Sequence, residues 1–152
     1  MPRFRAQVPG PGSGLAAGPS GLYPEAMRLE CAMLYVKDFP HMRKFYEQML
    51  GTPPVNTEWT DTWALFDVGG ARFALHAIPP EYARNIQISS PPKARETDPV
   101  KLIFAVDNVP AERNRLETMG ITMLQRPWQE PTEACEGVDP EGNIFQISAV
   151  RL

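Results

Sequence analysis

The chain has 152 residues, of which 43% are hydrophobic, and a formal net charge of −3. This size predicts one domain or two very small ones, with enough apolar side chains for a core. The acidic balance argues against a nucleic-acid partner, and no apolar run approaches the roughly 20 residues that span a membrane. Two cysteines, Cys31 and Cys135, do not make a disulfide framework, so the sequence predicts a reduced protein of the cytoplasm.

Residues 1–27 are rich in Pro, Gly, Ala and Ser and show no hydrophobic period. A segment of this composition buries too little apolar surface to offset the entropy lost on ordering. The sequence therefore predicts a flexible tail before the folded part, which we expect at residues 28–152.

A strand–turn–helix unit follows at Leu29–Gly51. In its strand, the side chains of Cys31, Met33 and Tyr35 alternate with those that would pack on the helix. Asp38 is a good N-cap, and Gly51 is a typical C-terminal stop. The pattern predicts a strand that packs one face on the helix, while the other face, with Cys31, Met33 and Tyr35, points away from the helix.

Three strands are predicted after the helix, at about 55–60, 62–68 and 71–78. Gly69-Gly70 between the last two is a strong signal for a two-residue hairpin. In the last strand, Arg72 and His76 share one face. We expect a first module at residues 28–79, and a long polar loop at 80–98 that joins it to the rest.

The first unit then repeats. A strand at about 100–105 carries Lys101 and Ile103 on one face, Asn108 takes the place of Asp38, and a second helix ends near Gly120. Strands are predicted at about 121–126, 132–138 and 143–149, within a second module at residues 99–152. The order is βαβββ twice, so the sequence predicts an α+β fold made by duplication.

This duplication resembles the vicinal oxygen chelate superfamily, which includes glyoxalases, bleomycin resistance proteins and extradiol dioxygenases. The matching motifs are V-K-D-F-x5-F-Y-x3-L-G at 36–51, V-D-N-V at 106–109 and D-P-E-G-N at 139–143. The resemblance implies curled mixed sheets around a ligand cavity and a small-molecule ligand. A fold shared by so many chemistries names no reaction by itself.

The resemblance also implies where a divalent metal would bind, on the first and last strands of each module. These positions fall on Cys31, His76, Lys101 and Gln146. A lysine ammonium repels a cation and has no acceptor lone pair, so a bound Zn, Fe, Mn or Ni ion would have to use Cys31, His76 and Gln146.

Without a metal, the same positions would form a pocket for a small, anionic molecule. Two cations and a histidine beside apolar groups favour a carboxylate-bearing ligand. The candidate ligand-binding residues are Met33, Tyr35, Trp63, Arg72, His76, Lys101, Ile103 and Gln146. The alternative for the charged residues is that Arg72 and Lys101 extend into solvent, and that His76 is an interior, hydrogen-bonded histidine.

Two functions follow from these alternatives. The first is metal-independent binding of a small molecule, as in sequestration or carrier proteins. The second is a metal-dependent lyase, isomerase or dioxygenase with a divergent metal site. A homodimer is expected in either case, since dimers are the commonest oligomers.

Overall fold

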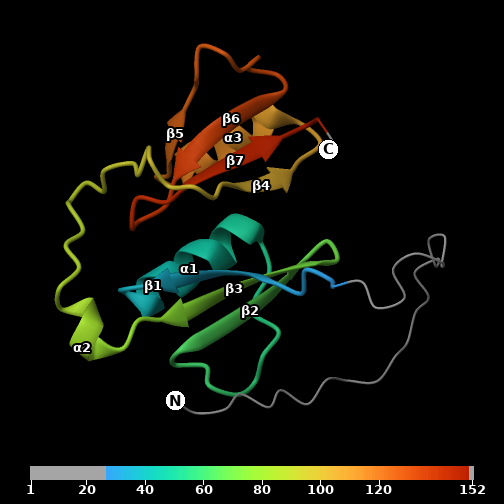
Figure 1. Ribbon diagram of the computed structural model, residues 1–152. Helices are drawn as coiled ribbons and strands as arrows, with labels where there is room; N and C mark the ends of the chain where they lie inside the picture. Colours follow the sequence, from blue (N-terminus) through green and yellow to red (C-terminus); the bar gives the residue numbers. More distant parts are fainter. Residues whose placement is uncertain (1–26, 151–152) are drawn as a thin grey trace.

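The computed structural model describes residues 27–150. The predicted tail at 1–27 therefore lies outside the described residues, apart from Met27. Two separate sheets form, one from each half of the chain, in a fold of class α+β (Figure 1). Neither sheet closes on itself, and the strand order within each mixes parallel and antiparallel neighbours.

Sheet A contains three strands in the order β1-β3-β2. Strand β1 (Ala32–Val36) pairs in parallel with β3 (Ala71–Ala77), which pairs antiparallel with β2 (Trp63–Val68). Helix α1 (Phe39–Leu50) follows β1 and packs on β3. Its N-cap is Asp38, whose carboxylate accepts a hydrogen bond from the His41 amide, and Gly51 ends it with a left-handed φ of 67°. Both predicted ends of this helix are confirmed.

The strand predicted at 55–60 is wrong. The Asn56 side chain replaces the backbone there, because its Oδ1 accepts from the Leu65 amide at 2.8 Å and its Nδ2 donates to the Trp63 carbonyl at 3.0 Å. Further along, Trp59 adopts a left-handed φ of 53°, which extended backbone does not permit. The segment follows the edge of β2 without continuing as a strand.

Sheet B contains four strands in the order β4-β7-β6-β5. Its strands are β4 (Leu102–Ala105), β5 (Thr122–Leu124), β6 (Ala134–Val138) and β7 (Ile144–Ser148). Helix α3 (Val109–Thr118) packs on β5 and β6, and its N-cap Asn108 accepts from the Ala111 amide at 2.9 Å. The repeat of strand, capped helix and antiparallel strands is thus confirmed.

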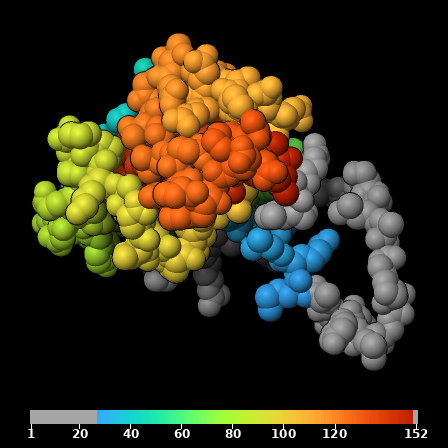
Figure 2. Space-filling view, turned by 90° about the horizontal axis from the view of Figure 1, so that it is seen from above, coloured from blue at the N-terminus to red at the C-terminus, as the bar shows by residue number. Residues whose placement is uncertain are grey.

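The segment predicted as a long loop contains one short helix, α2 (Pro80–Ala83). Beyond it the chain runs along the second half of the molecule, where the Arg95 amide donates to the Gly142 carbonyl at 2.9 Å. Figure 2 shows this yellow segment lying against the orange second half. The connection is therefore attached to sheet B's half over part of its length.

One core joins the two halves. Buried apolar side chains from both helices and both sheets form a single cluster. The rings of Phe73 in β3 and Phe104 in β4 meet across it, with centroids 6.4 Å apart. The DPEGN turn adds polar contacts: the Glu141 carboxylate accepts hydrogen bonds from the amides of Lys37 and Asp38 at 2.7–2.9 Å. These contacts fix which face of each sheet is turned inward.

Candidate functional site

A row of three rings crosses the outer face of sheet A. Strand register places Tyr35 of β1 and Trp63 of β2 on either side of His76 in β3. The ring centroids of Tyr35 and His76 are 5.5 Å apart, and those of Trp63 and His76 are 5.7 Å apart. Tyr35 is 62% exposed, so the row is accessible in the single chain. The ring planes are inclined to each other by 55° and 74°, so a planar group can stack on one ring and meet its neighbour at an edge.

A hydrogen bond to the backbone also orients the His76 ring. Its Nδ1 lies 2.8 Å from the carbonyl oxygen of Ala77, which fixes the orientation of the imidazole. The next row on the same face places exposed Met33 opposite Ala74. Because the Ala74 side chain is a single methyl group, the three rings of the first row are the largest side-chain groups in the middle of this face.

The other end of the sheet A face carries Cys31 and Arg72. The Arg72 guanidinium forms an ion pair with Glu30 at 3.4 Å, and both side chains are largely exposed. Exposed pairs of this kind contribute little to stability. Burial raises the pKa of the Cys31 thiol, and the nearby charge of Arg72 only partly opposes this. Cys31 is therefore a thiol at neutral pH.

The outer face of sheet B holds the remaining candidates. Ile103 of β4 is paired with Gln146 of β7, and Gln146 is paired on its other side with Glu136 of β6. The Lys101 ammonium is bonded to the Glu136 carboxylate, which also accepts from Arg126 Nε at 2.6 Å. Burial alone raises the pKa of Glu136, but the two cationic donors outweigh it and place the pKa below its ordinary value.

The two faces do not meet within one chain. Phe73 and Phe104 face each other across the core, and alternate side chains of a strand point to opposite sides. His76 and Lys101, on the other faces of these two sheets, therefore point away from the shared core. A pocket that contains Arg72, His76 and Lys101 together therefore stays a prediction, and it requires the two outer faces to be brought together by a second copy of the chain.

The predicted metal ligands do not fit a single ion either. Cys31 lies four residues before Tyr35, the partner of His76, which is roughly 13 Å along the strand. Gln146 lies on the other sheet. Among residues 27–150, no three His, Cys, Asp or Glu side chains are grouped closely enough to hold a metal ion. The donor set Cys31, His76 and Gln146 is therefore not assembled in this chain.

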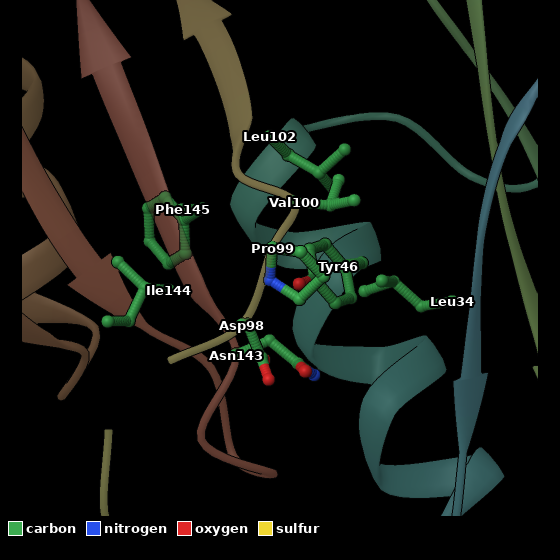
Figure 3. Close-up of a pocket in the computed structure, with 9 residues that line it drawn as sticks. All are labelled: Leu34, Tyr46, Asp98, Pro99, Val100, Leu102, Asn143, Ile144 and Phe145. Carbon is green, nitrogen blue, oxygen red and sulfur yellow. The ribbon is translucent and has the colours of Figure 1, made fainter. Parts of the chain in front are cut away.

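A small hollow lies between the halves rather than on the outer faces (Figure 3). Its volume is about 120 Å³, and its lining comes from β1, α1, the end of the connecting segment, β4 and the start of β7. The lining residues are Leu34, Tyr46, Asp98, Pro99, Val100, Leu102, Asn143, Ile144 and Phe145. None of the eight candidate ligand-binding residues lines it.

Sequence reasoning missed the residues that surround Lys101. Glu136 and Arg126 bind each other, and Gln129 donates from Nε2 to Gln146 Oε1 at 3.2 Å. One signal was visible: Glu136 alternates with Cys135 in a predicted strand, which places a carboxylate on the outer face. Arg126 and Gln129 lie in the connection between β5 and β6. The alternation of side chains along a strand does not apply there, so the sequence does not indicate which way these two side chains point.

The sequence matches the model of the glyoxalase-like domain over residues 31–148. The chain belongs to the glyoxalase-like domain family, and through it to the vicinal oxygen chelate superfamily. No curated protein matches it. Among residues 27–150, no helix is both long and apolar enough to cross a membrane.

Solved structures share the fold at low identity. The fosfomycin resistance protein FosX from Listeria monocytogenes is 15% identical, with a TM-score of 0.62 over 84% of this chain and 94% of that chain. The bleomycin resistance determinant of transposon Tn5 is 16% identical, with a TM-score of 0.56 over 83% of this chain and 100% of that chain. Lactoylglutathione lyase from Agrobacterium tumefaciens is 18% identical, with a TM-score of 0.57 over 82% of this chain and 94% of that chain. These likenesses establish the fold, which resistance proteins and enzymes share.

Proposed function

We propose that this chain binds a small molecule with a planar apolar part on the outer face of sheet A, without a metal ion in the position usual for the superfamily. The observation that carries the proposal is the row Tyr35–His76–Trp63, with its ring spacings of 5.5 and 5.7 Å. A planar ligand on this row gains aromatic contacts and removes the exposed Tyr35 ring from water.

The charge around Lys101 bears on the predicted anionic character of the ligand. Lys101 and Arg126 supply two positive charges, and Glu136 between them neutralises one. Glu96, the second partner of Arg126, supplies a second negative charge, so the four side chains are neutral as a set. Support for an anionic group on the ligand comes from the Lys101 ammonium alone, because its side chain is 41% exposed and its bond to Glu136 uses one of three donors.

We further propose that two copies of the chain form a homodimer that covers both outer faces. Large apolar side chains are exposed on each face in the single chain: Met33 and Tyr35 on sheet A, and Ile103 on sheet B. A second copy placing its sheet B face over sheet A would bury them and bring Lys101 near the aromatic row.

Two unpaired cysteines fit a reducing compartment, and we propose that the protein lies in the cytoplasm.

A metal-dependent lyase, isomerase or dioxygenase is the second candidate. The Listeria FosX protein, in a variant form, was solved with Mn(II) and 1S,2S-dihydroxypropylphosphonic acid. For this chain the candidate requires donors from two copies, because Cys31 and His76 of one chain are too far apart to share an ion.

The test is a fluorescence titration with 8-anilinonaphthalene-1-sulfonate, a probe with a planar naphthalene ring system and one negative charge. We expect saturable binding that Tyr35→Ala weakens by roughly threefold to tenfold. The matched control is Tyr82→Ala, because Tyr82 in α2 is 65% exposed, about as much as Tyr35. Equal affinities for the two variants would contradict the proposal.

The same titration with N-phenyl-1-naphthylamine, which lacks the sulfonate, tests the charge preference. Weaker binding of this neutral probe supports an anionic ligand, and equal binding of both probes removes that part of the proposal. Sedimentation of the wild-type chain tests the dimer.

A further inference from the structure

The hollow between the two halves has walls that are mostly apolar (Figure 3). Leu34 of β1 and Leu102 of β4 line it and are only partly buried, although both side chains pack against the shared core. The ring of Phe145 in β7 forms a further wall. An apolar cavity of about 150 Å³ accepts benzene, so the roughly 120 Å³ of this hollow can hold about five non-hydrogen atoms.

One end of the hollow carries hydrogen-bond acceptors. Figure 3 shows Asp98 and Asn143 at the same end, away from Leu102. Asn143 donates from Nδ2 to Asp139 Oδ2 at 2.8 Å, and a carboxylate only accepts, so the amide is oriented with its Oδ1 turned away from Asp139. Asp98 is exposed at the rim and takes part in none of the ion pairs among residues 27–150, Arg95 three residues earlier included.

A buried negative charge lies behind this end. Asp139 accepts from the Tyr46 hydroxyl and from the Asn143 amide group. Hydrogen bonds in such a chain polarise one another, so the bond to Asp139 makes Asn143 Oδ1 a better acceptor. With the Asp98 carboxylate beside it, this end attracts a cation that has N–H donors and disfavours an anion.

We propose that this hollow is a second ligand site, which binds a small primary ammonium with an aliphatic chain of about four carbons. The ammonium donates to the Asp98 carboxylate and to Asn143 Oδ1. The chain lies against Leu34, Leu102 and Phe145 and removes the two leucine side chains from water. This site goes beyond the proposed function, because it lies between the inner faces of the sheets and prefers a cation.

A packing defect with a solvated aspartate at its rim is the structural alternative. A defect takes any apolar molecule of the right size, whatever its charge, and the Asp98 carboxylate has no part in that binding. A site for an alkylammonium needs the apolar walls and the carboxylate together. The two accounts therefore differ in how affinity depends on the charge of the ligand.

Isobutylamine and isobutanol are the matched probes, since they share a carbon skeleton and only the amine is charged at pH 7. Amide chemical shifts of the full chain are followed by NMR as each probe is added at constant ionic strength. We expect saturable shifts in β1, α1 and the start of β7. Because Asp98 is exposed, isobutylammonium should bind roughly threefold to fivefold tighter than isobutanol. It should bind at least about tenfold tighter than methylammonium, which lacks the apolar chain.

Asp98→Asn removes the charge and keeps the shape of the side chain, and it should make the affinities for isobutylammonium and isobutanol equal. The matched control is Asp107→Asn, at an exposed aspartate between β4 and α3, which should leave the preference for the cation unchanged. Leu34→Phe fills the hollow and should abolish the binding of both probes. If its amide spectrum shows that this variant does not fold, Leu102→Phe fills the hollow from β4.

Three outcomes would overturn the inference: equal affinity for isobutylammonium and isobutanol in the wild type, a cation preference that survives Asp98→Asn, or binding that persists in the filled variant. The proposed function fails separately. Isobutylammonium should not displace 8-anilinonaphthalene-1-sulfonate, and displacement would contradict a second site. If the naphthalene probes do not distinguish Tyr35→Ala from Tyr82→Ala, the aromatic row is removed as a binding surface and this site is retained.

Discussion

The hydroxyl of Tyr46 in α1 donates a 2.8 Å hydrogen bond to Oδ2 of Asp139, joining the two halves of the chain inside the core. Both side chains are almost wholly buried. Burial raises the pKa of each group, and the negative charge of Asp139 raises that of Tyr46 further, so the tyrosine remains the proton donor at neutral pH. Asp139 also organises its own turn by accepting from the amides of Glu141 and Asn143.

Tyr46→Phe should lower the free energy of unfolding by about 2 kcal/mol, because it removes a buried hydrogen bond to a charged acceptor. The measurement is urea denaturation at pH 7. Tyr82→Phe at an exposed position should change stability by less than about 0.5 kcal/mol. A loss as small at Tyr46 as at Tyr82 would mean that the bond does not join the halves.

Glu141→Ala should cost about 2 kcal/mol as well, since the amides of Lys37 and Asp38 would lose their acceptor at the start of α1. Hydrogen exchange at these two amides is the direct readout, and we expect faster exchange in the variant. Glu130→Ala, at an exposed glutamate, is the control. Unchanged exchange at both amides would count against the contact.

Gly137→Ala should destabilise the second half by about 1–3 kcal/mol, because a Cβ at this position would lie 2.2 Å from the Phe145 ring. Phe145→Leu makes room for the added methyl group but leaves a cavity in the core. In a double-mutant cycle, Gly137→Ala should therefore cost clearly less in the Phe145→Leu background than in the wild type. Additive effects would show that the ring and the glycine do not contact.

Glu136 predicts a pH dependence of stability. Its pKa is below the ordinary value of 4.5, so the ionised carboxylate stabilises the fold above about pH 4.5 and loses this contribution as the pH falls through the folded-state pKa. Glu136→Gln should be less stable than the wild type by about 2 kcal/mol at pH 7. The difference should shrink below pH 4.5, as measured by urea denaturation at several pH values. A difference that is constant down to pH 3 would contradict the ion-pair assignment.

The sequence predicted the parts of the fold that local patterns determine. Asp38 and Asn108 cap their helices through their own side chains, and the alternation around Tyr35 gives the outer face of β1. These features depend on residues within one turn or one strand. The prediction of a strand at 55–60 was wrong because the Asn56 side chain makes hydrogen bonds that the backbone of a strand would make. The alternation of apolar and polar residues does not reveal this competition between side chain and backbone.

The candidate site was predicted only in part, because its residues come together through register and packing. Placing His76 between Tyr35 and Trp63 requires both strand pairings of sheet A. Separating His76 from Lys101 requires knowing that the halves pack through Phe73 and Phe104. Neither relationship is contained in the spacing of residues along the chain.

The central claim is that the outer face of sheet A binds a small molecule without a metal ion. The most direct test is the dissociation constant of 8-anilinonaphthalene-1-sulfonate for chelator-treated, metal-free protein, compared with the same protein reloaded with Zn, Mn, Fe or Ni. We predict equal affinities in all samples for the wild type and a weaker affinity for Tyr35→Ala. Binding that appears only after reloading with one ion per chain, and that His76→Ala abolishes, would contradict the claim and favour the metal-dependent enzyme.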